Sequence, residues 1–136
     1  MSHRSEPNTM HNLSKATYLL EQVKEKFPKP PNQVIISIGT FSEIQQHDLE
    51  DGFEILARTD SYLENVNIKY ITHQGKIQCL DCDYKGSIPS EGIEYSEVHG
   101  VPPRISCPTC QSPTVLIISG DEVKLHGIND QIINIT

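Results

Sequence analysis

Two cysteine pairs constrain this chain more than any other feature of its sequence. Cys79 and Cys82 form the first pair and Cys107 and Cys110 the second, with 24 residues between the pairs. A two-residue spacer lets both sulfurs of a pair approach one cation at about 2.3 Å, and two such pairs complete a tetrahedral shell suited to zinc. Because four thiolates leave no open position on the metal, we expect a structural zinc site.

The alternatives to structural zinc are a redox-active pair, an iron centre and free cysteines. The reactive cysteine of a thioredoxin-like pair lies at a helix N-terminus. Here Asp-Tyr-Lys-Gly follows Cys82 and Gln-Ser-Pro follows Cys110, and both sequences favour turns. We therefore expect zinc, while the other three interpretations stay open.

The segment between the pairs is too polar to form a core unaided. Glycine, proline, serine and aspartate are frequent in it, and the chain of 136 residues is only 36% hydrophobic and 6% aromatic. A chain of this length buries one modest core. Metal binding would supply the stability that hydrophobic burial does not supply here.

The charge of the chain argues against nucleic acid and membranes as partners. Lys and Arg number 11 against 18 Asp and Glu, a net charge of −7, and such a field repels phosphate backbones and anionic lipid. Between the cysteine pairs, Lys85 and Arg104 are outnumbered by carboxylates, so Tyr84 and Tyr95 are expected to pack rather than to stack on bases. We find no spanning apolar run and no signal-peptide core, and expect a cytoplasmic protein.

Outside the cysteine region, the patterns predict two helices and several strands. Apolar residues at three- and four-residue spacing predict helices over 14–27 and 48–58, the first ended by prolines. Strands are expected over 33–39 and from Val66 onward, and Gly120-Asp121 between two apolar runs (114–119 and 122–126) predicts a β-hairpin. Residues 1–9 are polar and aperiodic, so we expect a disordered lead, a segment before an alternative translation start or an expression remnant.

These elements predict an α+β protein with two helices on a small mixed sheet and an inserted zinc-ribbon-like module that carries the four cysteines. The α+β domain is expected to comprise 10–76 and 114–136, and the inserted zinc-binding domain 77–113.

The order of these features resembles the HypA/HybF family, the nickel-incorporation accessory proteins of [NiFe]-hydrogenase maturation. The matching parts are Met10-His11 before the first helix, Ile36-Ser37-Ile38-Gly39 with Phe41-Ser42, the helix around 49–53, both cysteine pairs, and the late run 119–123.

The resemblance implies a nickel metallochaperone with structural zinc on the four cysteines and nickel as transported cargo. It implies the hydrogenase large subunit and a nickel-insertion GTPase as partners, and leaves urease, reached through its accessory proteins, as a second recipient.

The resemblance also implies His11 as the nickel ligand, together with the backbone nitrogens of Met10, His11 and Asn12. Nickel(II) favours square-planar nitrogen sets, which a terminal amine, backbone amides and one imidazole can supply from consecutive residues. Family members typically begin Met-His-Glu, whereas here Asn12 follows His11 and nine residues precede Met10. The implied site therefore requires a chain that begins at Met10.

Other histidines offer weaker signals. His3 stands third from the N-terminus, a spacing that can enclose nickel, so it is the alternative nickel ligand; otherwise it is an unstructured polar residue. His47, His73, His99 and His126 show no HxxxH or HExxH spacing and are expected at the surface or in turns. The acidic residues of 48–54 are expected to form a solvated helix face.

No pattern in the sequence predicts catalysis. We find no Ser/His/Asp or Cys/His nucleophile arrangement, no phosphate-binding glycine loop and no open zinc site, and expect a protein that is not an enzyme. The alternative function is that of a zinc-ribbon interaction or regulatory protein without nickel delivery.

Overall fold

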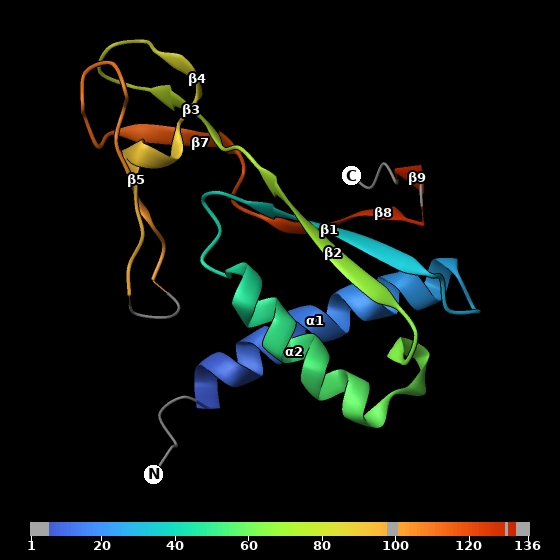
Figure 1. Cartoon of the computed structure of the whole chain (residues 1–136). Coiled ribbons are helices and arrows are strands. Elements are labelled where there is room, and N and C mark those ends of the chain that lie inside the picture. Colours follow the sequence, from blue (N-terminus) through green and yellow to red (C-terminus); the bar gives the residue numbers. More distant parts are fainter. Residues whose placement is uncertain (1–5, 98–100, 130, 133–136) are drawn as a thin grey trace. The chain divides into compact units, whose positions relative to one another are not determined.

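The computed structural model describes the backbone of residues 6–97, 101–129 and 131–132, and the side chains of residues 13–97 and 101–129. The chain divides into two compact units (Figure 1). The helical unit comprises the described parts of Met1–Ser37, Ile44–Ile71 and Lys124–Thr136. The cysteine unit comprises Ile38–Glu43 and Thr72–Val123, so it contains the expected insert 77–113 and extends beyond it on both sides.

Two helices that pack against each other dominate the helical unit: α1 (Glu6–Lys26) and α2 (Gln46–Thr59). The helix α1 ends just before the proline run, as predicted, but it begins at Glu6 rather than near Ser14. Residues 6–9 of the expected lead are therefore helical, whereas residues 1–5 lie outside the described part of the chain.

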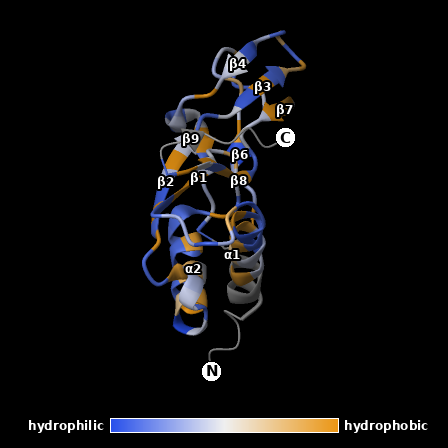
Figure 2. Cartoon of the chain, turned by 90° about the vertical axis from the view of Figure 1, so that its right-hand side faces the viewer, coloured by the Kyte–Doolittle hydropathy of each residue, from blue (hydrophilic) through white to orange (hydrophobic). Residues whose placement is uncertain are grey.

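The core of the helical unit lies between these helices and one face of the sheet. Figure 2 shows hydrophobic segments on the inner sides of α1 and α2. The apolar side chains with the least exposure in this unit are Ala16, Leu19, Ile36, Leu49, Leu125 and Ile128. Buried apolar residues recur at spacings of three and four in the helices, and at a spacing of two in the strands, as in Val34 with Ile36 and Val123 with Leu125. These periodicities explain why the segments fold as they do.

Four strands form the first sheet in the order β2-β1-β8-β9, with β1 (Gln33–Gly39), β2 (Asn67–His73), β8 (Val123–Ile128) and β9 (Gln131–Ile132). The Asn67 N–H donates to the Asn32 carbonyl at one end, and the Thr40 N–H donates to the His73 carbonyl at the other. This pattern makes β1 and β2 parallel, with α2 as their crossover helix. The β8–β9 pair is antiparallel, so the sheet is mixed and the predicted fold class is confirmed.

The second sheet lies in the cysteine unit and has the order β4-β3-β7, with β3 (Lys76–Cys79), β4 (Lys85–Ser87) and β7 (Val115–Ser119) all antiparallel. A short pair, β5 (Ile93–Glu94) with β6 (Arg104–Ile105), adds a two-stranded sheet. The predicted hairpin across Gly120-Asp121 is wrong, because β7 pairs with β3 whereas β8 belongs to the first sheet. Gly120 (φ +97°) turns the chain from one sheet to the other.

Three glycines of the cysteine unit bring separate backbone segments into contact. A Cβ on Gly39 would lie 2.0 Å from the Gly120 carbonyl oxygen, and a Cβ on Gly120 would lie 2.3 Å from the Gly75 Cα. The Phe41 N–H donates to the Gly120 carbonyl over 2.8 Å, which holds these segments together. No larger residue fits such a backbone approach.

An ion pair joins the C-terminal ends of the two helices. Lys24 Nζ lies 2.6 Å from Asp60 Oδ2, and Asp60 also accepts a hydrogen bond from the Tyr62 N–H. The Tyr62 hydroxyl in turn donates to the Phe27 carbonyl over 2.6 Å. The Lys24 hydrogen bond, with that of Tyr62, holds the pKa of Asp60 below its usual range.

An Asp60→Asn variant should lose stability near neutral pH but not in strong acid. Because folding lowers the pKa of Asp60, the carboxylate contributes stability above its unfolded pKa, and the contribution is lost as the pH falls through the folded pKa. For a pair this exposed we expect about 0.5–1 kcal/mol at pH 7, measured by thermal unfolding of the zinc-loaded protein. The control is Arg58→Gln, which removes a pair with Glu54 at 3.7 Å in which both side chains are 68% exposed. Below about pH 3 the thiols are protonated and both proteins are compared without zinc; a difference between Asp60→Asn and the parent that persists unchanged there would contradict the assignment.

Candidate metal centre

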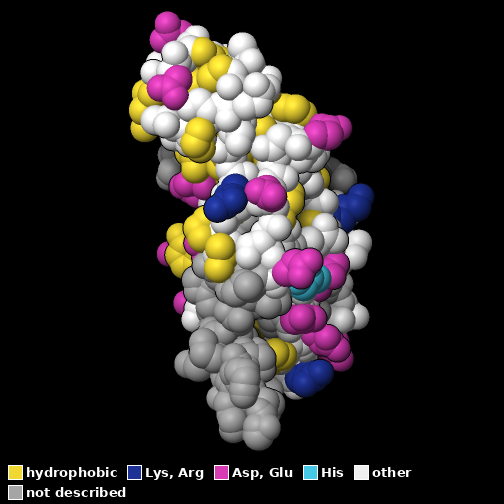
Figure 3. Space-filling view, turned by 90° about the vertical axis from the view of Figure 1, so that its left-hand side faces the viewer, with side chains coloured by type: hydrophobic (Ala, Val, Ile, Leu, Met, Phe, Trp, Pro, Cys, Tyr) yellow, Lys and Arg dark blue, Asp and Glu magenta, His cyan; other side chains and the backbone are white. Residues whose placement is uncertain are grey.

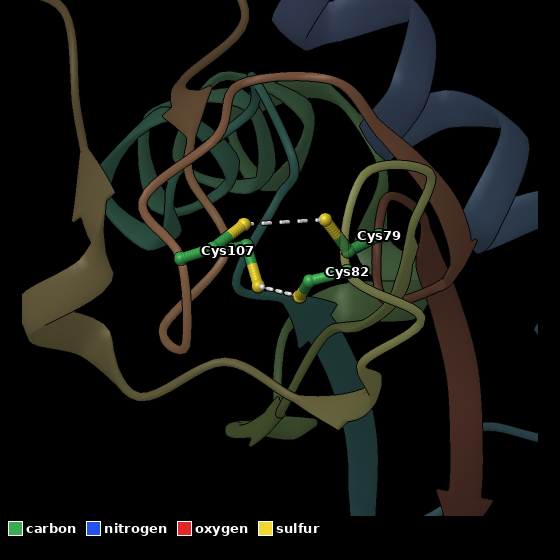
Figure 4. A group of neighbouring side chains, drawn as sticks. Cys79, Cys82 and Cys107 are labelled. Atoms are coloured by element: carbon green, nitrogen blue, oxygen red, sulfur yellow. Dashed lines mark hydrogen bonds between the residues drawn. The ribbon is translucent and has the colours of Figure 1, made fainter.

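Two tight turns of the cysteine unit bring the four cysteines together. Cys79 ends β3 and Cys82 lies in the turn before β4, whereas Cys107 and Cys110 lie between β6 and β7. All four Sγ atoms lie within 4.8 Å of one another. Two contacts join the two turns: Cys79 Sγ to Cys110 Sγ is 3.7 Å and Cys82 Sγ to Cys107 Sγ is 3.5 Å. Figure 4 shows the sulfurs of the labelled cysteines turned toward a common centre.

These separations fit four thiolates around one zinc ion. With Zn–S bonds of about 2.3 Å, the edge of a regular sulfur tetrahedron is about 3.8 Å. The separations of 3.7 and 3.5 Å are close to that edge and far longer than a disulfide bond of about 2.05 Å. The donor set of four soft sulfurs also suits zinc.

The two cysteine turns have the same local geometry. In each turn, the first cysteine sulfur accepts a backbone N–H two residues on, Asp81 N to Cys79 and Thr109 N to Cys107, both at 3.4 Å. The residue after each second cysteine has a positive φ, 66° for Asp83 and 62° for Gln111. Hydrogen bonds to the sulfurs orient metal ligands and stabilise their charge.

A small apolar core supports the centre from one side. Cys79 and Cys107 are each 1% exposed and belong to a buried cluster with Phe41, Ile77, Ile88 and Ile93. Cys82 is half-buried and Cys110 is exposed. The first cysteine of each pair therefore anchors the site in the core, while the second lies toward solvent.

The thiols have sharply different affinities for protons. Burial acts to raise the pKa of Cys107, but the N–H groups of Cys110 and Thr109 and the neighbouring cysteines lower it to about 7. The N–H of Tyr84 acts to lower the pKa of Cys82, but burial and the three other cysteines raise it to about 12. Zinc binds thiolates, so a metal ion must displace the protons that remain on the cluster when it binds.

The backbone of the predicted nickel residues belongs to the helical unit, whereas the four cysteines belong to the cysteine unit. The backbone of Met10, His11 and Asn12 lies in α1, and their side chains, like the whole of His3 and His99, lie outside what the structure describes. His73 is exposed, and His126 is half-buried. His47 is also exposed, with Nε2 3.3 Å from Asp48 Oδ1. Within the described residues, the four cysteines are the one group that could hold a metal ion.

Some residues of the centre escaped the sequence analysis. The Ser112 hydroxyl donates to Asp81 Oδ2, which links the two cysteine turns, and Ser112 Oγ accepts the Thr114 N–H over 3.1 Å. Asp83 and Gln111 hold positive φ angles that usually favour glycine or asparagine. Asp83 and Gln111 each follow the second cysteine of a pair, and this shared position is the sequence feature that could have identified them.

The described surface carries more acidic than basic groups on one face, which Figure 3 presents. Tyr84 packs against the core cluster, as predicted, and donates to the Ser87 carbonyl. Tyr95 is 44% exposed, and its hydroxyl donates to the Thr40 carbonyl over 2.8 Å. Neither described helix has the length and hydropathy needed to cross a membrane.

Comparison with known proteins places this centre in a family. Residues 10–129 match the family model described as "Hydrogenase/urease nickel incorporation, metallochaperone, hypA". The chain belongs to the HypA family. This family consists of metallochaperones for nickel incorporation in hydrogenase maturation rather than enzymes, and its members bind zinc and nickel.

Individual relatives agree with this assignment. The hydrogenase maturation factor HypA of Aquifex aeolicus is 28% identical over 123 residues, covering 88% of this chain and 96% of the relative. That of Streptomyces avermitilis is 25% identical over 125 residues, covering 88% and 86%. The solution structure of the Ni metallochaperone HypA from Helicobacter pylori shares the fold, with a TM-score of 0.55 at 16% identity over 93% of this chain and 98% of that one.

Proposed function

We propose that this chain binds Ni(II) and passes it on for insertion into the large subunit of a [NiFe] hydrogenase. The HypA-family match carries this proposal, because it takes in Met10-His11 and all four cysteines. The partners that we propose are the hydrogenase large subunit and a nickel-insertion GTPase, with urease accessory proteins as a second route. We propose the cytoplasm as its location, since thiols stay reduced there.

We propose that Cys79, Cys82, Cys107 and Cys110 hold a structural zinc. Their four sulfurs and the N–H groups that orient two of them support this role. Bound zinc would hold the two cysteine turns together and leave no coordination position for substrate.

We propose His11 as the nickel ligand, with the backbone nitrogens of Met10, His11 and Asn12. Because α1 begins at Glu6, these residues follow the first four helical positions. Their N–H groups therefore donate to carbonyl groups within the helix. In a chain that begins at Met10, the terminal amine and the next amides would belong to the first turn, which lacks such acceptors. The match from residue 10 supports this shorter form as the nickel-binding one.

A His11→Ala variant of the Met10 form should lose nickel binding and keep its zinc. Removing the only imidazole of the proposed nitrogen set should weaken nickel binding by about a hundredfold or more, or about 2.7 kcal/mol, measured by calorimetric titration. Zinc should remain at one ion per chain by elemental analysis. The matched control is His47→Ala, which removes an exposed imidazole of α2 and should leave the nickel affinity unchanged.

Two outcomes would contradict the proposal. Equal nickel affinity of His11→Ala and the parent would exclude His11 as a ligand. Zinc without any nickel binding in the Met10 form would favour the alternative function, a zinc-ribbon interaction protein. A higher nickel affinity for the Met10 form than for the longer chain would support the backbone-nitrogen site.

A further inference from the structure

The outer strand of the cysteine-unit sheet, β7, has an apolar and uncharged edge (Figures 1 and 2). Within the described residues it pairs with β3 alone. Its consecutive side chains Leu116, Ile117 and Ile118 are 53%, 45% and 47% exposed. Edge strands are normally protected by charged residues, proline, a β-bulge or a covering segment, and here only a register irregularity beside Ile118 is present in the β3–β7 pair. The strand β7 contains neither charge nor proline.

The backbone of β7 also presents hydrogen-bonding groups to this edge. The Leu80 N–H donates to the Thr114 carbonyl, which fixes that pair as hydrogen-bonded, and the antiparallel register continues with Gln78 opposite Leu116 and Ile77 opposite Ile117. The register then shifts between Ile77 and Lys76, which lies opposite Ser119. Because bonded and non-bonded pairs alternate, Leu116 bonds toward β3 whereas Ile117 directs its N–H and carbonyl away. An added strand would find a donor and an acceptor there.

The sheet face beside this edge is cationic, although the protein as a whole is acidic. Lys76 and Gln78 are exposed and alternate along β3 with the buried Ile77 and Cys79. The register brings Lys85 of β4 and Leu116 of β7 opposite Gln78, so the two lysines and Leu116 share this open face. The strands β3, β4 and β7 contain no carboxylate. The net charge of −7 makes such a face unusual here.

We propose that β7 docks an extended segment of a partner protein in which apolar residues alternate with carboxylates. Such a segment would add as a fourth strand along Ile117, with its apolar side chains beside Leu116 and Ile118. Strands are spaced about 4.8 Å apart, so the added strand would lie about 10 Å from β3, where a long Lys76 side chain can reach a carboxylate across β7. The proposal is independent of nickel binding.

The charges disfavour a second copy of this chain as the occupant. Pairing of two β7 strands would bring together two cationic faces and supply no carboxylate from either strand. A partner segment with alternating carboxylates would pair with the backbone N–H and carbonyl of Ile117 and would also place a carboxylate near Lys76.

The test uses a fluorescein-labelled dodecapeptide of alternating valine and glutamate, titrated with the zinc-loaded full chain and followed by fluorescence anisotropy. The glutamate peptide should bind, and a valine–lysine peptide of equal length should not. The double variant Lys76→Glu/Lys85→Glu should weaken binding by about tenfold or more, since the pair with Lys76 becomes repulsive and the whole sheet face changes from cationic to anionic. The control Lys26→Glu/Lys29→Glu changes net charge equally at exposed positions elsewhere and should have less than a twofold effect.

An Ile117→Pro variant tests the backbone contribution. Proline removes an N–H that points away from β3, so the ladder with β3 should persist while peptide binding falls; zinc content verifies the fold. Three results would overturn the proposal: no binding of the glutamate peptide, equal binding of the lysine peptide, or no effect of Lys76→Glu/Lys85→Glu. A concentration-dependent dimer in sedimentation, abolished by Ile117→Pro, would also overturn it and assign the edge to a second copy.

Discussion

A Cys107→Ser variant should lose its zinc and the fold of the cysteine unit, while the helical unit stays folded. The core cluster around Cys79 and Cys107 is small, and the segments that it joins are short strands and turns. Structural zinc sites contribute about 10–16 kcal/mol of apparent binding free energy, more than such a core can replace. The helical unit has its own core between α1, α2 and the first sheet, so its amides should remain protected.

Elemental analysis and hydrogen exchange would measure both parts of this result. Amides of β3, β4 and β7 should exchange rapidly in Cys107→Ser, and those of α1 and α2 slowly. The control is Thr109→Ala, which keeps the backbone N–H that bonds the Cys107 sulfur and should retain one zinc per chain. If Cys107→Ser kept protected β3 and β7 amides without zinc, the cluster would not depend on metal for its fold.

The cysteine centre could be predicted because its geometry is local. Two residues between cysteines fix how two sulfurs approach one point, so each half of the site is encoded within four residues. The link from Ser112 to Asp81 could not be predicted, because it depends on how the two turns face each other. The two residues are 31 positions apart, so their contact cannot be read from the sequence even though each lies close to a predicted cysteine ligand.

The prediction that the strands β7 and β8 pair as a hairpin was wrong for a related reason. Gly120-Asp121 between two apolar runs suits a tight hairpin, but it suits equally a chain that leaves one sheet and enters another. Whether β7 and β8 pair with each other depends on the distant strands available to them: β7 pairs with β3, and β8 pairs with β1. It also depends on the close backbone approach of Gly39 to Gly120. The start of α1 was missed because the apolar periodicity begins only at Ala16, whereas the end was predicted because proline blocks a helix locally.

A Gly39→Ala variant should be severely destabilised, because its Cβ would lie 2.0 Å from the Gly120 carbonyl oxygen. That oxygen also accepts the Phe41 N–H, so relief of the clash would break a backbone hydrogen bond. We expect a loss of about 3 kcal/mol or more, in the range of the largest single-residue effects, measured by chemical denaturation of the zinc-loaded protein. Gly120→Ala should behave alike, since alanine at φ +97° is also strained.

Gly92→Ala is the matched control for these glycines. Its Cβ would meet only the Ile88 Cγ2, at 3.2 Å, and a side chain can move by a few tenths of an ångström where a backbone cannot. We expect its cost to stay below about 1 kcal/mol. If Gly39→Ala were as stable as Gly92→Ala, the approach of the segments around Gly39 and Gly120 would be looser than the structure gives it. A large loss in Gly39→Ala and Gly120→Ala but not in Gly92→Ala would instead identify this contact as a tertiary constraint that fixes where β1 ends and where the chain turns from β7 to β8.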